Sequence, residues 1–285
     1  MAKRNYWGHE IPSPQTVITN AAIGSQIDGL LRKVADLLGV DRSSQSEIIE
    51  SILESAREVE NEIEFEKRVK ARLIGRCDRS KMQEAIRERS ITIFNEITKH
   101  YVGQSLLDVG CGNGFISGMS KPRFSEIQLM DVVNYVDPSV ELPYAAYKEG
   151  APFSLGRQFD TVILLTVLHH ANDPMTLLRE SWKSTKGRLL IIESVFGVHS
   201  QPPSGHYELA QHETSDQIAY AVFVDWLYNR ILNDDIPVPY NFTTPEKWSQ
   251  VFEDGEMRVA NTINLGQDIE IAPELHFLFV LERER

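Results

Sequence analysis

From Ser105 onward, short apolar segments alternate with segments of helical period, and this alternation restricts the chain to few folds. The segments SLLDV, EIQLMD, FDTVILLT and GRLLIIESV read as strands, and the helical segment PMTLLRESWKSTK precedes the last of them. Such alternation is typical of βαβ units, in which helices cover both faces of a parallel sheet. Two further strands, MRVANTINL and ELHFLFVLERE, are separated by a short loop, which predicts an antiparallel pair at the sheet edge.

A glycine-rich elbow joins the first strand to the helix that follows it. The elbow reads LLDVGCGNGFIS, in which Asp108 is followed by Gly110, Gly112 and Gly114. Glycine is needed where φ is positive or where a ligand approaches the backbone closely, and helix N-termini bind anionic groups. A tight turn without a ligand is the alternative. The dinucleotide fingerprint GxGxxG is not met, because Phe115 occupies the position of its third glycine.

The N-terminal part of the chain has a different sequence pattern. Residues 1–20 form a polar arm, and three segments with apolar residues at spacings of three and four follow: IDGLLRKVADLLGV, SEIIESILESAREVENEIEFEKRVKARLIG and DRSKMQEAIRERSITIFNEITKHYVG. Asp78 or Ser80 could cap the third helix, and Gly103 could end it. We therefore predict an N-terminal arm and helical subdomain over residues 1–103 and an α/β domain over 104–285.

Five motifs in the same order make residues 104–283 similar to a known family. They are the elbow, the strand IQLMD, the segment PFSLGRQFDTVILLTVLHHANDP, the helix and strand LLRESWKSTKGRLLIIES, and the late helix FTTPEKWSQVF. Together they resemble the class I S-adenosylmethionine-dependent methyltransferases, specifically the small-molecule "type 11" group. The resemblance implies a Rossmann-like, doubly wound, mostly parallel seven-stranded sheet with an antiparallel edge hairpin, and S-adenosyl-L-methionine as cofactor.

The resemblance also implies which residues bind the cofactor. The elbow and Asp108 correspond to the methionine site of the family, and Asp131 corresponds to the acid that binds both ribose hydroxyls. Glu149 is a candidate for the adenine contact, although it lies closer to Pro152 than is usual in the family. Cys111 is interpreted as a small residue of the elbow rather than as a reactive thiol. The predicted cofactor-binding residues are Asp108, Gly110, Cys111, Gly112, Gly114, Asp131, Glu149 and Thr166.

The histidines are candidates for two kinds of chemistry. His169 and His170 follow the fourth strand at the carboxyl edge of the sheet, where ligands of open α/β folds bind, and either could line the site or act as a general base. His199, His206 and His212 share a loop with two glutamates, but their spacing matches no closed zinc pattern. We expect a solvated lid loop there, and no metal site.

An aromatic insertion separates the fifth strand from the late helix. Its segment IAYAVFVDWLYNRIL places Tyr220, Trp226 and Tyr228 on one helix, and either a core helix or a substrate cap fits this spacing. Because the insertion follows the ligand edge of the sheet, we predict that residues 195–242 form a cap with these three residues toward the substrate. Glu193 and Asp225 are its expected acidic neighbours.

The composition restricts the classes of partner and the cellular setting that are expected for this chain. A net charge of −12 disfavours general nucleic-acid binding, which relies on clustered Lys and Arg. With two cysteines, Cys77 and Cys111, no disulfide framework is expected, and the longest apolar run, VILLTVL, is too short to cross a bilayer. The expected setting is the cytoplasm, where a homodimer through the N-terminal helices could form.

Three functions fit these observations. Methyl transfer from S-adenosyl-L-methionine to a small, partly apolar or aromatic metabolite fits the series of motifs. Methylation of RNA or protein would use the same cofactor half, and a non-catalytic scaffold that binds the cofactor is the third alternative. The sequence leaves open whether the methyl group is transferred to oxygen, nitrogen, carbon or sulfur.

Overall fold

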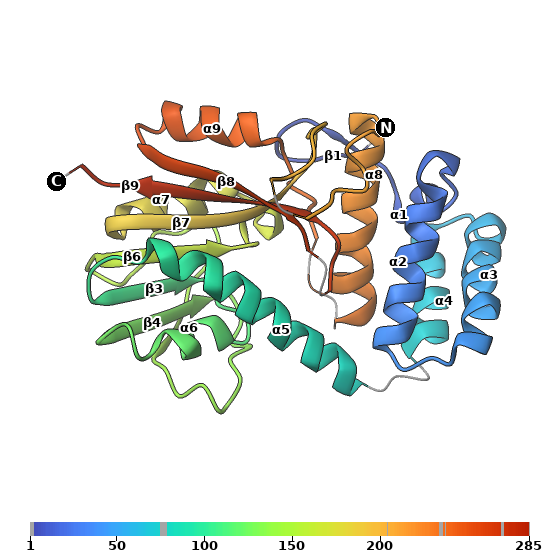
Figure 1. Cartoon of the computed structure of the whole chain (residues 1–285), viewed down its shortest axis with the longest axis horizontal. Helices are drawn as coiled ribbons and strands as arrows, with labels where there is room; N and C mark the ends of the chain where they lie inside the picture. The colour runs from blue at the N-terminus through green and yellow to red at the C-terminus, as the bar shows by residue number, and fades with distance from the viewer. Residues whose placement is uncertain are drawn as a thin grey trace.

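The computed structural model describes residues 3–74, 79–203, 205–233, 236, 238–268 and 271–284. Its centre is a seven-stranded sheet in the order β5-β4-β3-β6-β7-β9-β8 (Figure 1). The strands are β3 (Ser105–Val109), β4 (Glu126–Asp131), β5 (Tyr144–Ala146), β6 (Phe159–Leu165), β7 (Thr185–Val195), β8 (Val259–Gln267) and β9 (Leu275–Glu282). The strands from β5 to β7 are parallel, whereas β9 runs antiparallel to both β7 and β8. The predicted Rossmann-like sheet with its antiparallel edge pair is therefore confirmed.

Helices cover both faces of the sheet, and each face has its own hydrophobic core. Neighbouring residues of one strand point to opposite cores: Leu106 packs with α5 (Arg79–Ile97) on one face, and Leu107 belongs to the larger core on the other. The remaining helices beside the sheet are α6 (Phe115–Ser120), α7 (Pro174–Lys183) and α9 (Pro245–Asp254). Helix α6 is short, and Thr244 caps α9 by accepting from the Lys247 amide at 3.2 Å.

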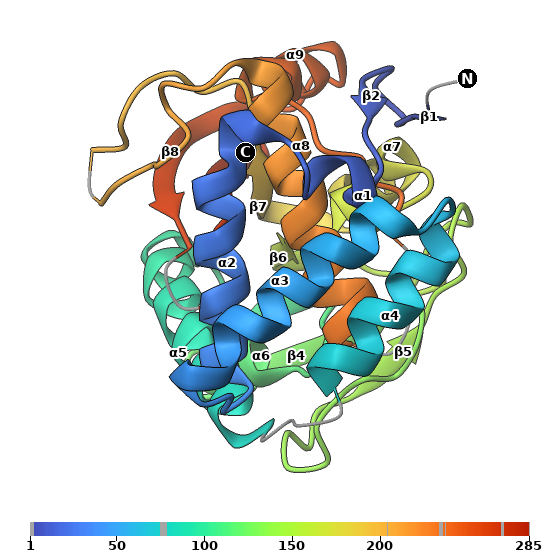
Figure 2. The same cartoon turned by 90° about the vertical axis from the view of Figure 1, so that its right-hand side faces the viewer.

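The N-terminal helices form a separate layer beyond one end of the sheet (Figure 2). They are α1 (Pro14–Val17), α2 (Gly24–Leu37), α3 (Arg42–Glu58) and α4 (Glu62–Ile74). The sequence pattern was continuous from Ser46 to Gly75, but the structure divides it into α3 and α4. Asn61 accounts for the break, because its side chain accepts from the Glu64 amide at 2.9 Å and so starts a new helix.

The aromatic insertion is a buried helix between the sheet and the N-terminal layer (Figure 1). It comprises α8 (Thr214–Asp225) and a π-helical continuation, Trp226–Leu232. Every residue of α8 from Gln217 to Asp225 is buried. In the preceding loop His199, Gln201 and His206 are exposed, whereas Tyr207, Leu209 and Ala210 are buried. The insertion thus lies at the predicted edge of the sheet, and the lid role of its loop stays a prediction.

The N-terminal arm docks onto the α/β part. Short strands β1 (Lys3–Arg4) and β2 (Glu10–Ile11) pair with each other. Asn5 donates from its side chain to the carbonyls of Tyr240 and Phe242, both at 2.9 Å, and Trp7 packs edge-on against Trp248. The arm therefore fixes the last residues of the aromatic insertion, which follow its helix.

Some expectations are not tested by this architecture. Cys77 and the proposed cap Asp78 lie outside the described residues. The domain boundary at residues 103 and 104 and the homodimer stay predictions. Within the described ranges, none of the helices combines the length and the apolar character that a membrane span requires.

Candidate active site

The glycine elbow has the backbone geometry that its sequence suggests. Gly110, Gly112 and Gly114 have φ angles of 72°, 53° and 74°. A Cβ atom on Gly110 would lie 2.5 Å from the Val167 side chain, whereas a Cβ atom on Gly112 would meet nothing within 4 Å. Gly110 is thus required for packing, and Gly112 faces open space into which a ligand can fit.

Two buried carboxylates flank this elbow. Asp108 is 3% exposed and accepts a 2.6 Å hydrogen bond from Ser117, and burial raises its pKa to about 7. Asp131, at the end of β4, accepts from the Gly112 amide at 3.0 Å and from the Val132 amide at 2.7 Å. Burial also raises the pKa of Asp131. Both groups would gain from hydrogen-bond donors or a positive charge on a ligand.

A cavity of about 400 Å³ lies at the carboxyl edge of the sheet, next to the elbow. It brings together most of the predicted cofactor residues, which are separated by up to 58 positions in the sequence (108 to 166). Helix α5 forms one wall of this cavity, and the segment from Thr166 to Asn172 forms another. The predicted residues that line it are Asp108, Gly110, Cys111, Gly112, Asp131, Glu149, Thr166 and His170.

The far wall of this cavity carries a fixed carboxylate and a strained residue. Glu149 accepts from the Asn172 side chain at 2.7 Å and from the Asn172 amide. Thr166 has a φ of 57°, which is rare for a β-branched residue, and its amide donates to Ile192 at 2.7 Å. Such strained positions cluster at ligand sites.

His169 is held in place by a buried carboxylate. Its Nδ1 lies 2.7 Å from Oε2 of Glu193, and both residues are almost fully buried. The other Glu193 oxygen accepts from the amides of Val167 and Leu168 at 2.9 and 2.7 Å. Burial lowers the pKa of His169, but the charge and the hydrogen bond of Glu193, together with the charges of Asp225 and Glu274, outweigh this effect and raise the pKa to about 9. His169 therefore keeps its proton at neutral pH, which disfavours a role as general base.

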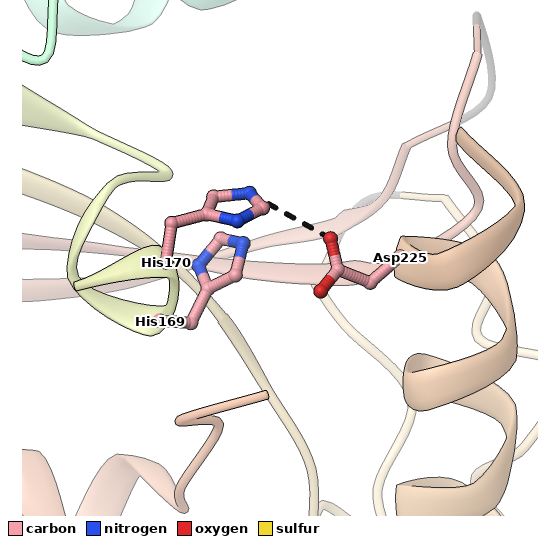
Figure 3. A group of neighbouring side chains, drawn as sticks. All are labelled: His169, His170 and Asp225. Atoms are coloured by element: carbon pink, nitrogen blue, oxygen red, sulfur yellow. Dashed lines mark ion pairs between the residues drawn. The ribbon is translucent and has the colours of Figure 1, made fainter. Parts of the chain in front are cut away.

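His170 faces the insertion helix. Its Nε2 lies 3.6 Å from Oδ1 of Asp225, and Figure 3 shows this carboxylate pointing toward both histidine rings. Asp225 is 2% exposed, and burial raises its pKa to about 7. The expected acidic neighbours, Glu193 and Asp225, thus each approach one histidine.

A second cavity, of about 370 Å³, adjoins the first. The two share Ile86, Arg89, Thr166, His170 and Asn229 in their walls. The apolar part of the second cavity comes from α5, from the ends of α2 and α4, from the π-helical segment and from residues 271–272. Its polar part consists of Gln83, Arg89, Thr166, His169, His170, Asp225, Tyr228, Asn229, Asn233 and Glu274.

Three predicted site residues line neither cavity. Gly114 is the N-cap of α6, and a Cβ atom there would lie 3.3 Å from three apolar side chains. Tyr220 donates its hydroxyl to Glu208 at 3.0 Å, and Trp226 stacks on Phe65 with a centroid separation of 5.5 Å. Of the three aromatic candidates for substrate contact, only Tyr228 lines the second cavity, and its hydroxyl donates to the Ile271 carbonyl at 2.6 Å.

Other lining residues were missed by the sequence reasoning. Arg89, on α5, borders both cavities and forms an ion pair with Asp268. Asn229 borders both cavities from the π-helical segment, and Asn172 borders the first from the turn before α7. For Asn172 a signal was available, because it lies within the matched HHANDP segment. For Arg89 and Asn229 no local pattern indicates a site.

Comparison with known proteins gives a family for most of the chain. Residues 56–254 match the model of the family described as "Methyltransferase domain". A curated relative, the tRNA U34 carboxymethyltransferase of Nautilia profundicola, is 30% identical over 106 residues. That match covers 32% of this chain and 35% of the relative, so the chain spans about a third of the relative's length.

Solved structures of low sequence identity are also similar. A magnesium protoporphyrin IX methyltransferase from Synechocystis PCC 6803 with bound SAH is 12% identical and has a TM-score of 0.45, with 94% of this chain and 100% of that chain covered. An S-adenosylmethionine-dependent methyltransferase from Aquifex aeolicus is 16% identical, with a TM-score of 0.43 and coverage of 66% and 88%.

Proposed function

Since this chain belongs to the methyltransferase-domain family and is a class I S-adenosylmethionine-dependent methyltransferase, we propose that it methylates a small, partly apolar metabolite. The observation that carries this proposal is the second cavity, which adjoins the first and shares five of its lining residues. Apolar side chains such as Met82, Leu232 and Ile271 lie in its wall beside the polar groups. A cavity of this size suits a metabolite-sized acceptor.

We place the cofactor in the first cavity, along the elbow. The open space at Gly112 fits the backbone approach of its methionine part, and the buried Asp108 carboxylate is suited to its ammonium group. Asp131 would accept from the ribose hydroxyls, and Glu149 or Asn172 would contact the adenine. When bound, the cofactor supplies a methyl group already activated on a sulfonium.

The protein would then contribute by positioning the acceptor relative to the cofactor rather than by covalent chemistry. Residues between the cavities, such as Thr166, His170 and Asn229, would orient the acceptor toward the first cavity. Holding two reactants in line lowers a barrier by on the order of 7–11 kcal/mol in well-oriented reactions.

The ribose assignment predicts a loss of affinity in Asp131→Ala. Removal of a charged acceptor costs about 1.5–3 kcal/mol, so the dissociation constant for S-adenosylmethionine should rise roughly 10- to 150-fold. Titration calorimetry would measure this change, with Asp137→Ala on the adjacent exposed loop as the control. A lower melting temperature with an unchanged dissociation constant would instead show that Asp131 only supports the loop amides.

The ammonium assignment predicts a dependence of cofactor affinity on pH. Because the pKa of Asp108 is raised to about 7, the ionised fraction grows from about 9% at pH 6 to about 76% at pH 7.5. Affinity should therefore tighten about eightfold over this interval, in which the cofactor's amino group stays mostly protonated. In Asp108→Asn the profile should be clearly flatter than in the wild type; equal profiles in the two proteins would contradict the assignment.

The acceptor class is tested by turnover with cofactor carrying a labelled methyl group. We expect label in small molecules of a metabolite extract, and none in tRNA. The curated relative that acts on tRNA favours RNA as the second candidate, whereas the net charge of −12 opposes it. Label in tRNA alone would reverse this order, and tight cofactor binding without any turnover would support a scaffold.

A further inference from the structure

His169, His170 and Asp225 bring three metal-ligand atoms together in the wall of the second cavity. One ligand atom from each residue lies within 4.8 Å of the other two. The rings come from the turn after β6 and the carboxylate from the end of α8, so two distant segments converge (Figure 3). Two imidazoles and one carboxylate are a known ligand set for divalent transition-metal ions with open positions. We propose that this group binds such an ion.

The first supporting feature is the partner of His169. Glu193 lies 2.7 Å from Nδ1 of His169, which leaves Nε2 as the ligand atom. Metal-binding histidines usually donate their second ring nitrogen to a carboxylate or a carbonyl, which fixes the orientation of the ring. The amides of Val167 and Leu168 hold Glu193 itself. The ion would displace the proton that His169 otherwise keeps.

The second supporting feature is an unsatisfied oxygen of Asp225. Its Oδ1 accepts from the Asn229 side chain at 2.6 Å, but its Oδ2 is buried and has no hydrogen-bond partner within the described ranges. A buried carboxylate oxygen without a donor is costly, so it indicates a missing ligand. Asp225 lines the cavity at the start of the π-helical segment, and π-helical turns are frequent at functional sites.

This ion would restrict the acceptor to molecules with a group that can bind a metal, an inference that rests on the proposed function. Because all three ligands line the cavity that we assign to the metabolite, the open positions of the ion would face that cavity, and an acceptor with a hydroxyl group would bind the ion through its oxygen. The ion lowers the pKa of that hydroxyl. After the proton leaves to solvent, an oxygen lone pair forms the new bond to the methyl carbon, and the electron pair of the broken carbon–sulfur bond stays on sulfur.

Cobalt(II) provides a direct test that does not depend on turnover. Titration of the full chain without a histidine tag should give one equivalent of Co²⁺ bound, with the visible d–d absorption of a mixed nitrogen and oxygen site, and Zn²⁺ should displace it. His170→Ala and Asp225→Asn should each abolish the absorption. Glu193→Gln, which touches no metal, should weaken Co²⁺ binding about 10- to 100-fold. The control His206→Ala removes an exposed histidine and should change nothing.

Two results would overturn the metal site: no Co²⁺ absorption in the wild type, or the same absorption in His170→Ala and Asp225→Asn. Melting curves of each variant identify misfolding. If Asp225→Asn unfolds, the test rests on His170→Ala, because the His170 side chain is 23% exposed and its removal should leave the fold intact. Calorimetry with S-adenosylmethionine on the same samples separates the two proposals. Failure to bind the cofactor would refute the proposed function, while absence of the Co²⁺ site would refute only the metal.

Discussion

Gly112→Val should weaken binding of S-adenosylmethionine by about a hundredfold or more, which corresponds to ~2.7 kcal/mol, while the protein stays folded. The reason is steric. A Cβ atom at Gly112 meets no protein atom within 4 Å, so the valine would project into the cavity where we place the cofactor. Its φ of 53° adds a local strain of about 1–2 kcal/mol, which a folded domain can bear.

The chain offers a matched control for this variant. Gly156 also has a positive φ, 63°, and no atom within 4 Å of an added Cβ, but it lines neither cavity. Gly156→Val should therefore lose similar stability and keep the wild-type dissociation constant, as measured by calorimetry and thermal unfolding. Equal affinity in Gly112→Val and Gly156→Val would refute our placement of the cofactor.

The structure also separates two glycines that the sequence made equivalent. By pattern alone, Gly110→Val and Gly112→Val should act alike. In the structure, a Cβ atom at Gly110 collides with Val167, so Gly110→Val would disturb the turn that carries His169 and His170 as well. The sequence identifies the elbow, but only the packing around it distinguishes a structural glycine from one that faces the cavity.

The sheet was largely predictable, because its strands are buried on both faces and read as continuous apolar runs. The short strand β5 was not identified, since YAA contains no such run. The division of α3 from α4 could have been predicted from Asn61 followed by Glu64, a pattern typical of helix starts. Long charged stretches conceal such starts, because the helical period continues through them.

The site was predictable where its residues follow the sheet strands in sequence. Asp108, Asp131 and His170 end up in one cavity because the carboxyl ends of parallel strands meet at one edge. Arg89 and Asn229 reach the same edge from α5 and the π-helical segment. Their positions depend on how these helices pack against the sheet, and no local pattern in the sequence encodes that packing.

Trp226 shows the same limit, since a spacing of three residues fits both a cap and a core helix. In the structure Trp226 is 1% exposed, stacks on Phe65 and donates to Glu66 at 3.3 Å, and both partners belong to α4. Arg230 adds an ion pair to Glu66 at 3.0 Å. Trp226 therefore joins the N-terminal layer to the insertion helix instead of facing the metabolite cavity.

Trp226→Ala should accordingly lower the free energy of unfolding by about 3–5 kcal/mol, as expected for the loss of a buried tryptophan. Urea unfolding followed by circular dichroism would measure this change, with Tyr6→Ala, an exposed aromatic, as a control that shifts stability by less than about 0.5 kcal/mol. A double-mutant cycle with Phe65→Ala should give a coupling of about 0.5–1.5 kcal/mol from the stacked rings. Under native conditions the cofactor affinity of the folded variant should be unchanged. Unaltered stability with a large loss of turnover would instead indicate that Trp226 contacts the substrate. Truncation of a core tryptophan must lower the free energy of unfolding, whereas truncation of a residue that only contacts the acceptor need not.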